Sequence, residues 1–314
     1  MEGDNGTVVT EFVLLGFSGF GSFRGPLFWG VLCIYLVTLL GNSLIIPLTL
    51  VDPALHSPMY FFLRHFSMVE TLYTTTIVPR MLADLLSSCP TIPSAICFTQ
   101  LYFFVLFGIT ECCLLTAMAY DRYAAICRPL HYTTLMNRGA CASMVGTSYL
   151  MGIIAGTTHS IFIFTLPFHG ANTIHHFLCD ILPVLRLASA NTFWGEQMVI
   201  VCSVLIFIMT LVCVVLSYMY IIRTILRFPS AQQRTKAFST CSSHIIVVSI
   251  TYGSCIFVYI KPSAKDEMAI NKGVTILTTS ISPMLNPFIY TLRNKQVKQA
   301  FKNLVKRIIL LSKS

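Results

Sequence analysis

Charged residues are scarce in this chain. They make up 11% of its 314 residues, whereas 55% are hydrophobic and the mean hydropathy is +0.75. A soluble domain usually carries about 25% charged residues, so this chain has too few of them to cover a surface that faces water. The shortage excludes an ordinary soluble globular protein and indicates a chain that lies in a membrane.

Polar interruptions are also rare within the hydrophobic runs. A helix that crosses the hydrocarbon core needs about 20 mostly apolar residues, and seven runs approach or exceed that length. A membrane barrel would instead show segments of about 10 residues that alternate apolar and polar side chains, whereas these runs are continuous. We therefore predict an all-α membrane protein with a seven-helix bundle. The runs are Pro26–Leu50, Pro58–Leu82 (the weakest, because charged residues interrupt it), Cys97–Tyr120, Ala140–Phe162, Met198–Ile222, His244–Tyr259 with its flanks, and Val274–Leu292.

Acidic residues are nearly absent from one set of loops. When the loops are assigned alternately to the two sides of the membrane, one side holds fifteen Lys and Arg against two acids, and the other holds six against eight. Loops rich in Lys and Arg stay in the cytoplasm, so we expect the N-terminus outside and the C-terminus inside. The net charge of +9 therefore predicts contact with membrane lipid, not with nucleic acid.

The chain shows no linker, internal repeat or low-complexity segment, so we predict one domain. Residues 1–25 lack the basic start and short apolar core of a cleavable signal peptide, and they form the expected extracellular N-terminus. Asn5 begins a triplet that can accept an N-linked glycan on that side. The bundle spans residues 26–292. Residues 293–314 form a cytoplasmic tail, in which apolar residues at helical spacing between lysines predict a short amphipathic helix at the lipid interface.

Few cysteines lie where a disulfide can persist. Of twelve, most fall within the hydrophobic runs, and only Cys89, Cys97 and Cys179 lie at or beyond the predicted outer face. We favour a bond between Cys97 and Cys179, which would tie the third run to the long outer loop. Cys89 is then either free or a competitor for a partner. The histidines of the same loop have no Cys or carboxylate at ligand spacing, so we expect a solvated loop there and not a metal site.

Two carboxylates are expected inside the membrane, where a charged residue costs about 2.5–3.5 kcal/mol on insertion scales. Glu70 in the second run and Glu111 in the third each lie about a dozen residues from an end, hence near mid-depth. If their faces meet, they cannot both be ionised without help. Either one is protonated or a Na⁺ ion lies between them, with Asn42 and Asn286 as further oxygen ligands. The alternative is that each forms separate hydrogen bonds within the bundle.

Proline interrupts the seventh run directly after Asn286. Pro287 has no backbone N–H and disrupts the helical hydrogen bonds, so the helix can kink there. A kink beside an asparagine is a candidate pivot for a conformational change.

Several motifs together resemble one known family. Residues 118–127 read MAYDRYAAIC and are followed by RPLHY; further matches are Gly41-Asn42, PMYFFL at 58–63, Ser217-Tyr218, KAFSTC at 236–241 and PMLNPFIY at 283–290. This ordered set resembles the signature of olfactory receptors, which are rhodopsin-like G-protein-coupled receptors. The chain departs from it in three places. Ala124 replaces a valine, two outer-loop cysteines are absent together (the matching positions are His169 and Ser189), and Glu70 stands where aspartate is commoner in the wider superfamily.

The resemblance implies roles at the cytoplasmic end of the bundle. Asp121 would hold Arg122 at rest, and Arg122 and Tyr218 would help to form the groove for a G protein when the sixth span swings outward. The residues assigned to coupling and activation are Asp121, Arg122, Tyr123, Tyr218, Asn286, Pro287 and Tyr290. The alternative for Arg122 is an interfacial anchor.

The resemblance also places a ligand pocket between the third, fifth, sixth and seventh spans, toward the outside. Positions counted from Arg122 and Tyr252 give the inward-facing candidates Phe104, Val105, Gly108, Ile109, Cys202, Ile206, Tyr252, Cys255 and Tyr259; the alternative is that they are simply core. Phe104 stands where amine receptors of the superfamily carry an acid, and no Lys or Arg is expected at that depth. We therefore expect a small, neutral, apolar ligand that offers a hydroxyl or carbonyl to Tyr259.

As a whole, the resemblance implies an odorant receptor of the plasma membrane, in the sensory cilia of olfactory neurons, that binds small volatile molecules and activates a stimulatory heterotrimeric G protein to raise cAMP. The chain shows no nucleophile–base pair or phosphate loop, so we expect no enzyme, and no cofactor beyond the candidate Na⁺. One alternative is a non-olfactory rhodopsin-like receptor, which would share the fold without these signatures. An ion-coupled transporter using Glu70 and Glu111 would favour internal repeats, and a scaffold would need larger exposed domains.

Overall fold

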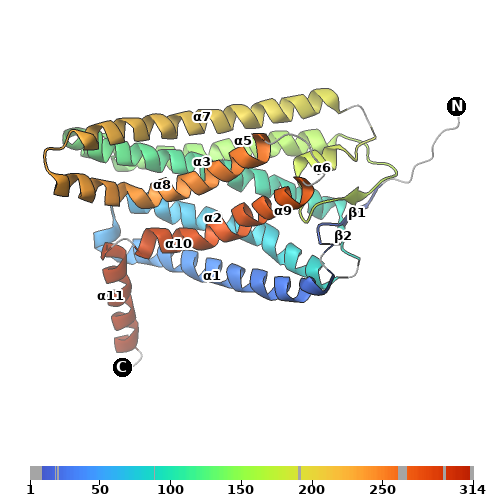
Figure 1. The fold of residues 1–314 in the computed structure, drawn as a ribbon, viewed down its shortest axis with the longest axis horizontal. Coiled ribbons are helices and arrows are strands. Elements are labelled where there is room, and N and C mark those ends of the chain that lie inside the picture. The colour runs from blue at the N-terminus through green and yellow to red at the C-terminus, as the bar shows by residue number, and fades with distance from the viewer. Residues whose placement is uncertain are drawn as a thin grey trace.

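Long helices make up most of the protein (Figure 1). The computed structural model describes residues 9–311 except 18, 20, 88, 190, 191, 261–266, 293 and 294. Each of the seven predicted runs lies in helix, and most of the helices extend several residues beyond the apolar run. The long helices are α1 (Arg24–Val51), α2 (Pro58–Leu86), α3 (Ser94–Cys127), α5 (Arg138–Phe164), α7 (Phe193–Leu226) and α8 (Ala231–Ile260); the last run forms α9 (Glu267–Ile276), a π-helical turn (Leu277–Ile281) and α10 (Ser282–Leu292).

Four of these segments are long and apolar enough to cross a membrane on composition alone, within the described residues: Gly21–Val51, Ser94–Cys127, Arg138–Phe164 and Phe193–Leu226. Helix α2 carries Arg64, Glu70, Arg80 and Asp84 and falls outside this group. It packs against both α1 and α3 and buries residues all along its length. A helix that is surrounded by protein can carry polar residues that a lipid-facing helix cannot.

Short elements connect the long helices. They are the 3-10 turns Gly21–Phe23, Pro53–Leu55 and Pro129–His131, together with α4 (Tyr132–Leu135) and α6 (Ile181–Leu185). Helix α5 begins where the sequence provides a cap, because the side-chain oxygen of Asn137 accepts the backbone N–H of Ala140 at 2.9 Å. Pro58 opens α2 at a position where a missing N–H costs nothing.

The tail forms the predicted amphipathic helix, α11 (Lys295–Leu311). It leaves the bundle at the end opposite the strands and runs across the direction of the long helices (Figure 1). Val297 and Ala300 are buried against the bundle, whereas Phe301 is exposed. Its place at a lipid interface stays a prediction.

A small sheet covers the end of the bundle where the N-terminus lies (Figure 1). Its central strand β1 (Glu11–Leu14) pairs antiparallel with β2 (Thr91–Pro93) and parallel with β3 (Thr173–Ile174). Phe12 faces Ile92 across the first pair, and both side chains are completely buried in a cluster with Cys97 and Cys179. Strands of two to four residues are too short to leave a pattern in the sequence, and sequence analysis did not predict them.

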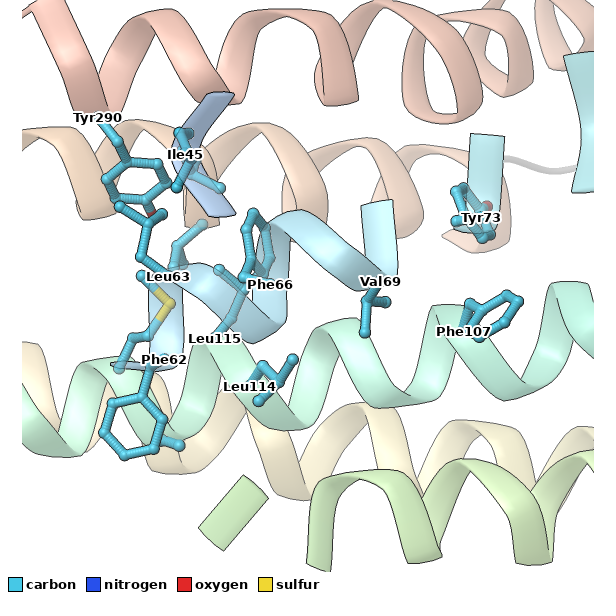
Figure 2. Packing of buried hydrophobic residues seen from close by; sticks show 14 of the residues in the cluster. Ile45, Phe62, Leu63, Phe66, Val69, Tyr73, Phe107, Leu114, Leu115 and Tyr290 are labelled. Atoms are coloured by element: carbon cyan, nitrogen blue, oxygen red, sulfur yellow. The ribbon is translucent and has the colours of Figure 1, made fainter. Parts of the chain in front are cut away.

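The main core lies around α3, which packs against α2, α5 and α7. Figure 2 shows Phe66 and Val69 of α2 beside Leu114 and Leu115 of α3, with Tyr290 of α10 at one end of the cluster. All five side chains are at most 5% exposed. This packing fixes the inner faces of the helices that carry the candidate sites.

Small residues bring α5 very close to α3. A Cβ atom on Gly152 would overlap the side-chain oxygen of Thr110 and the backbone oxygen of Leu106, and one on Gly156 would lie 3.1 Å from the backbone oxygen of Tyr102. The two glycines are four residues apart, the small-xxx-small spacing that permits close helix packing in membranes. Sequence analysis overlooked this motif.

Candidate functional site

Buried polar residues from four helices lie near one another in the middle of the bundle. Glu70 on α2 is completely buried, and Asn286 on α10 donates a hydrogen bond to one of its carboxylate oxygens. Glu111 on α3 is also buried and lies close enough to repel the charge of Glu70. Asn42 on α1 borders the same group. Glu70 has its own hydrogen bond to Asn286, so a shared site and separate hydrogen bonds both stay predictions.

Several buried oxygen atoms in this part of the bundle have no hydrogen-bond partner among the residues that the structure describes. Besides the second carboxylate oxygen of Glu70, they are the side-chain oxygens of Asn42, Ser67, Ser280, Ser282 and Asn286. Carboxylate, amide and hydroxyl oxygens are the ligands that hard cations take in proteins. The donor set therefore fits a Na⁺ ion, and it equally fits a proton shared by the carboxylates.

Asn42 also compensates for the proline of the seventh run. Pro287 cannot donate a helical hydrogen bond to the backbone oxygen of Pro283, and the side-chain amide of Asn42 donates to that oxygen at 3.3 Å instead. Helix α10 continues through Pro287, and the irregular backbone of this run lies earlier, in the π-helical turn at Leu277–Ile281. π-helical turns are frequent at functional sites.

Arg122 is held by its neighbour, as the resemblance implies. Its guanidinium donates two hydrogen bonds to one carboxylate oxygen of Asp121, one of them 3.0 Å long. The other oxygen of Asp121 accepts the hydroxyl of Tyr132, on α4, at 2.8 Å. Burial and the neighbouring carboxylate raise the pKa of Tyr132, so it keeps its proton and remains a donor. Tyr132 belongs to the RPLHY motif, but its role could not be predicted from the sequence.

A histidine that sequence analysis did not select joins three helices at the same end of the bundle. The Tyr218 hydroxyl on α7 lies 2.5 Å from Nδ1 of His244 on α8, and Nε2 of His244 lies 3.1 Å from the backbone oxygen of Leu115 on α3. One tautomer satisfies both bonds, with the hydroxyl donating to Nδ1 and Nε2–H donating to the carbonyl. A histidine at the start of an apolar run was the available signal.

The remaining activation candidates make other contacts, although Tyr290 lies near Tyr218 of this bridge. Tyr290 is buried, and its ring packs edge-on against Phe66 with centroids 6.3 Å apart. Pro287 packs against Gly41, where a Cβ would lie 2.9 Å from the proline ring. Tyr123 is half-buried, and its ring contacts that of Tyr220, which is exposed on the surface of α7.

The pocket candidates divide into two groups. Val105 is buried beneath the sheet in the cluster that contains Phe12, Ile92, Cys97 and Cys179, called here the outer cluster. Phe104, Ile109 and Ile206 pack against that cluster. Tyr252 belongs to the main core, where its hydroxyl donates to the backbone oxygen of Cys112 at 3.4 Å.

Other pocket candidates are placed less uniformly. Cys202 is exposed on the surface of α7, so the structure does not bring it to the others, and Cys255 is half-buried. Gly108 leaves room, because among the described residues a Cβ there would meet only Tyr73, at 4.0 Å. The side chain of Tyr259 and all of Asn5 lie outside the described residues.

Tyr73 is the residue of this region that sequence reasoning missed. It lies on α2 (Figure 2) and stacks on Phe104 of α3, with ring centroids 5.5 Å apart. Glu111 of α3 and Cys255 of α8 both lie near it. Charged residues interrupt the second run, so its sequence gave no reason to expect a pocket residue on α2.

The long outer loop is tied down over the mouth of the bundle. The disulfide between Cys97 and Cys179 is present, and Cys89 is free and exposed. The backbone N–H of Cys179 donates to the Gln100 side chain at 3.1 Å. Burial and, secondarily, the ammonium of Lys272 lower the pKa of His176 to about 4, so this loop histidine is neutral at physiological pH.

Comparisons with known proteins agree on one family. The family model described as "Olfactory receptor" matches residues 31–310. Among curated relatives, the chain is 64% identical to "Olfactory receptor 10P22" of Mus musculus over 309 residues, which cover 98% of this chain and 99% of the relative. It is 55% identical to "Olfactory receptor 10P1" of Homo sapiens over 308 residues, covering 98% of each chain, and 54% identical to "Olfactory receptor 6C2" of Homo sapiens over 309 residues, covering 98% and 99%.

Proposed function

This chain belongs to the olfactory receptor family, and on that premise we propose that it binds small neutral odorants within its helix bundle and activates a stimulatory heterotrimeric G protein, raising cAMP. It is a multi-pass membrane receptor and not an enzyme. Two sets of hydrogen bonds at one end of the bundle carry the proposal. In the first, Asp121 holds Arg122; in the second, His244 joins Tyr218 to α3.

The proposed orientation puts that end in the cytoplasm and the N-terminus outside. The end with Arg122 is also the end from which α11 extends, opposite the sheet and the N-terminus (Figure 1). The Lys and Arg residues concentrate in the loops and the tail assigned to this side, as the positive-inside rule requires. The cell membrane of sensory cilia is the proposed location.

Signalling in this proposal depends on α8 moving away from α3. In the resting arrangement His244 bonds both α7 and the α3 backbone, so the three helices are held together. Outward movement of α8 breaks the bond from His244 to Leu115 and frees Tyr218. Arg122 then leaves Asp121, and with Tyr218 it lines a groove for the terminal helix of the G protein.

The proposed ligand is neutral because the aromatic and aliphatic side chains of the outer cluster offer it no charge. Phe104 stacked on Tyr73 forms one wall and Gly108 leaves space, while a hydroxyl from Tyr259 stays an expectation from the sequence. Apolar burial stabilises by about 25 cal/mol per Å², which for a compact odorant corresponds to micromolar affinity. The charge of the pair Glu70 and Glu111 beneath the pocket is neutralised by a bound Na⁺ or by a proton.

The test is cAMP accumulation in cells that express this chain with an olfactory-type stimulatory G protein, screened against a panel of small volatiles. We expect a ligand-dependent rise that Arg122→Ala abolishes. Arg128→Ala is the matched control, because Arg128 is exposed at the same helix end and makes no side-chain bond within the described residues. A response that survives Arg122→Ala at equal surface expression would refute the proposed coupling mechanism.

Removing the histidine bridge is expected to raise signalling without ligand. His244→Phe keeps an aromatic ring but loses the bonds to Tyr218 and Leu115. A hydrogen bond contributes about 0.5–1.5 kcal/mol, so losing two shifts the equilibrium toward the active state by about tenfold. Basal cAMP, normalised to receptor at the cell surface, measures this. Ile246→Phe on the lipid-exposed side of α8 is the control, and equal basal signalling in the two variants would contradict the role of the bridge.

A further inference from the structure

A large cleft opens on the side of the bundle, away from the proposed odorant pocket. It has a volume of about 680 Å³ and lies between α3, α5 and α7, with lining residues that include Ala117, Tyr120, Thr147, Met151, Met209 and Cys213. This volume falls in the range of about 300–1,000 Å³ that small-molecule sites have. Of the candidate odorant-binding residues, Ile206 alone belongs to its lining, at the edge nearer the outer cluster.

The cleft exists because α5 and α7 both pack on α3 but diverge from each other. In the described structure, α3 makes extensive contact with each of them, whereas α5 and α7 make little contact with one another. They approach in the outer half of the bundle, where Phe162 of α5 lies against Gly195 of α7 and Nε2 of His159 lies 3.2 Å from the hydroxyl of Ser203. Toward the other end α3 forms the floor and the two diverging helices form the walls.

The cleft faces lipid. On the α7 wall, Met209, Leu216 and Tyr220 are 56%, 46% and 55% exposed, and α7 is among the segments apolar enough to cross a membrane. From Ile206 to Tyr220 the lining covers 14 helical steps, or about 21 Å. One leaflet contributes about half of a 30 Å hydrocarbon core, or about 15 Å, so a cleft of this length covers one leaflet and reaches into the other. With the proposed orientation, the leaflet that it covers is the cytoplasmic one.

Serine and threonine hydroxyl groups give the lining a polarity that a plain acyl chain would not use; they belong to Thr116, Ser143, Thr147, Ser148, Thr210 and Ser217. The side chains of Thr116, Ser148 and Ser217 each donate to a backbone oxygen of their own helix, at 2.9, 2.8 and 2.8 Å. Their hydrogens are thus engaged, and their oxygens remain as acceptors. The occupant that suits this lining has a large apolar body and a hydrogen-bond donor.

Aromatic side chains concentrate at the cytoplasmic end of the cleft. Tyr123 and Tyr220 lie with ring centroids 5.9 Å apart, and Tyr120 lies 6.0 Å from Tyr123. Tyr220 is six residues before the end of α7, hence about 9 Å from the helix end and near the depth of the lipid headgroups. Flat rings at this depth are suited to pack against a rigid fused-ring body beside its polar end.

We propose that this cleft is a binding site for a membrane sterol, with the sterol hydroxyl toward Ser217 and Tyr220 and the ring system along α3. The residues Leu216, Tyr220 and Arg223 fit the L-x-Y-x-R type of pattern associated with sterol contact. That pattern is weak by itself, but Leu216 and Tyr220 both line the cleft. The site is separate from the odorant pocket, and only the leaflet assignment rests on the proposed orientation.

The test is photolabelling of the full-length receptor in cell membranes with a cholesterol analogue that carries a diazirine on the rings and an alkyne on the side chain. We expect adducts on the peptides of α3, α5 and α7 that line the cleft, and competition by unlabelled cholesterol. Cys213→Phe fills the cleft and is expected to lower this labelling about tenfold, the factor that about 1.4 kcal/mol of lost binding produces. Val212→Phe, on the exposed neighbouring position outside the cleft, is the matched control and should label as the unmodified receptor does.

Labelling spread evenly over all lipid-facing helices, or equal labelling of the two variants, would overturn the proposal. A phosphatidylcholine with a diazirine on its acyl chain is the second probe; if it labels the cleft as strongly and Cys213→Phe blocks it equally, the occupant is an acyl chain and the sterol assignment is wrong. Surface expression of every variant is measured first. Should Cys213→Phe fail to reach the surface, Thr147→Phe with Leu150→Phe as control repeats the comparison from the facing helix.

Discussion

Replacing Gly152 with alanine is expected to lower the free energy of unfolding by about 3 kcal/mol and to remove most receptor from the cell surface. The added methyl group would overlap the hydroxyl of Thr110 and the backbone oxygen of Leu106 on α3. Those two groups already bond to each other at 2.7 Å, and the backbone oxygen cannot move without moving the helix. Overpacking typically costs 1–3 kcal/mol, and a clash with backbone belongs at the upper end of that range.

Gly146→Ala on the same helix is the control for this experiment. A Cβ at Gly146 would meet nothing within 4 Å, so alanine there brings only its better helix propensity, about 0.5–1 kcal/mol. The two substitutions are chemically identical and should change the melting temperature of detergent-purified receptor in opposite directions. Equal melting temperatures would mean that α5 and α3 are farther apart than the structure shows.

Breaking the disulfide is the second substitution with a large expected effect. Cys97→Ser opens a link between residues 82 positions apart in sequence. In the loop-entropy account, a cross-link over a loop of that length lowers the entropy of the unfolded chain, which stabilises the folded receptor by about 4 kcal/mol. The bond also holds the outer loop against α3, so its loss should reduce both the melting temperature and the fraction of receptor that reaches the surface. Surface labelling and thermal unfolding without reductant measure the two effects.

Cys89→Ser controls for the loss of a thiol. Cys89 is free and exposed on the same side of the molecule, so its replacement should leave stability and surface expression unchanged. A loss in Cys89→Ser as large as that in Cys97→Ser would show that Cys89 takes part in a disulfide. That result would contradict the Cys97–Cys179 pairing as the sole outer bond among the described cysteines.

Some parts of the candidate site could be read from residue type and spacing. Glu70 and Glu111 were singled out because charge inside a membrane is costly, and the condition that their faces meet is one that the structure supplies, with Asn286 and Asn42 beside Glu70. The pair Asp121 and Arg122 is adjacent in sequence, so its ion pair needed little more than the motif itself.

Other parts depend on rotations and tilts of the helices that residue spacing does not specify. Cys202 was counted inward but is exposed on α7, because a long helix can rotate by a fraction of a turn without changing its apolar content. Tyr73 and His244 enter the sites from runs whose inward faces could not be identified by periodicity, since these helices are apolar or buried on more than one side.

The sequence by itself determined the class of this protein: the length and continuity of its apolar runs leave only a helical membrane bundle, the loop charges indicate its orientation, and the ordered motifs identify the family. These properties are local, because each depends on residues close together along the chain. Only the tertiary structure decided which side chains from different helices share one place. Gly152 against Leu106, His244 between Tyr218 and Leu115, and the lipid-facing cleft all arise from how helices far apart in sequence pack, and the approach of two helices is set by the side chains on both of them.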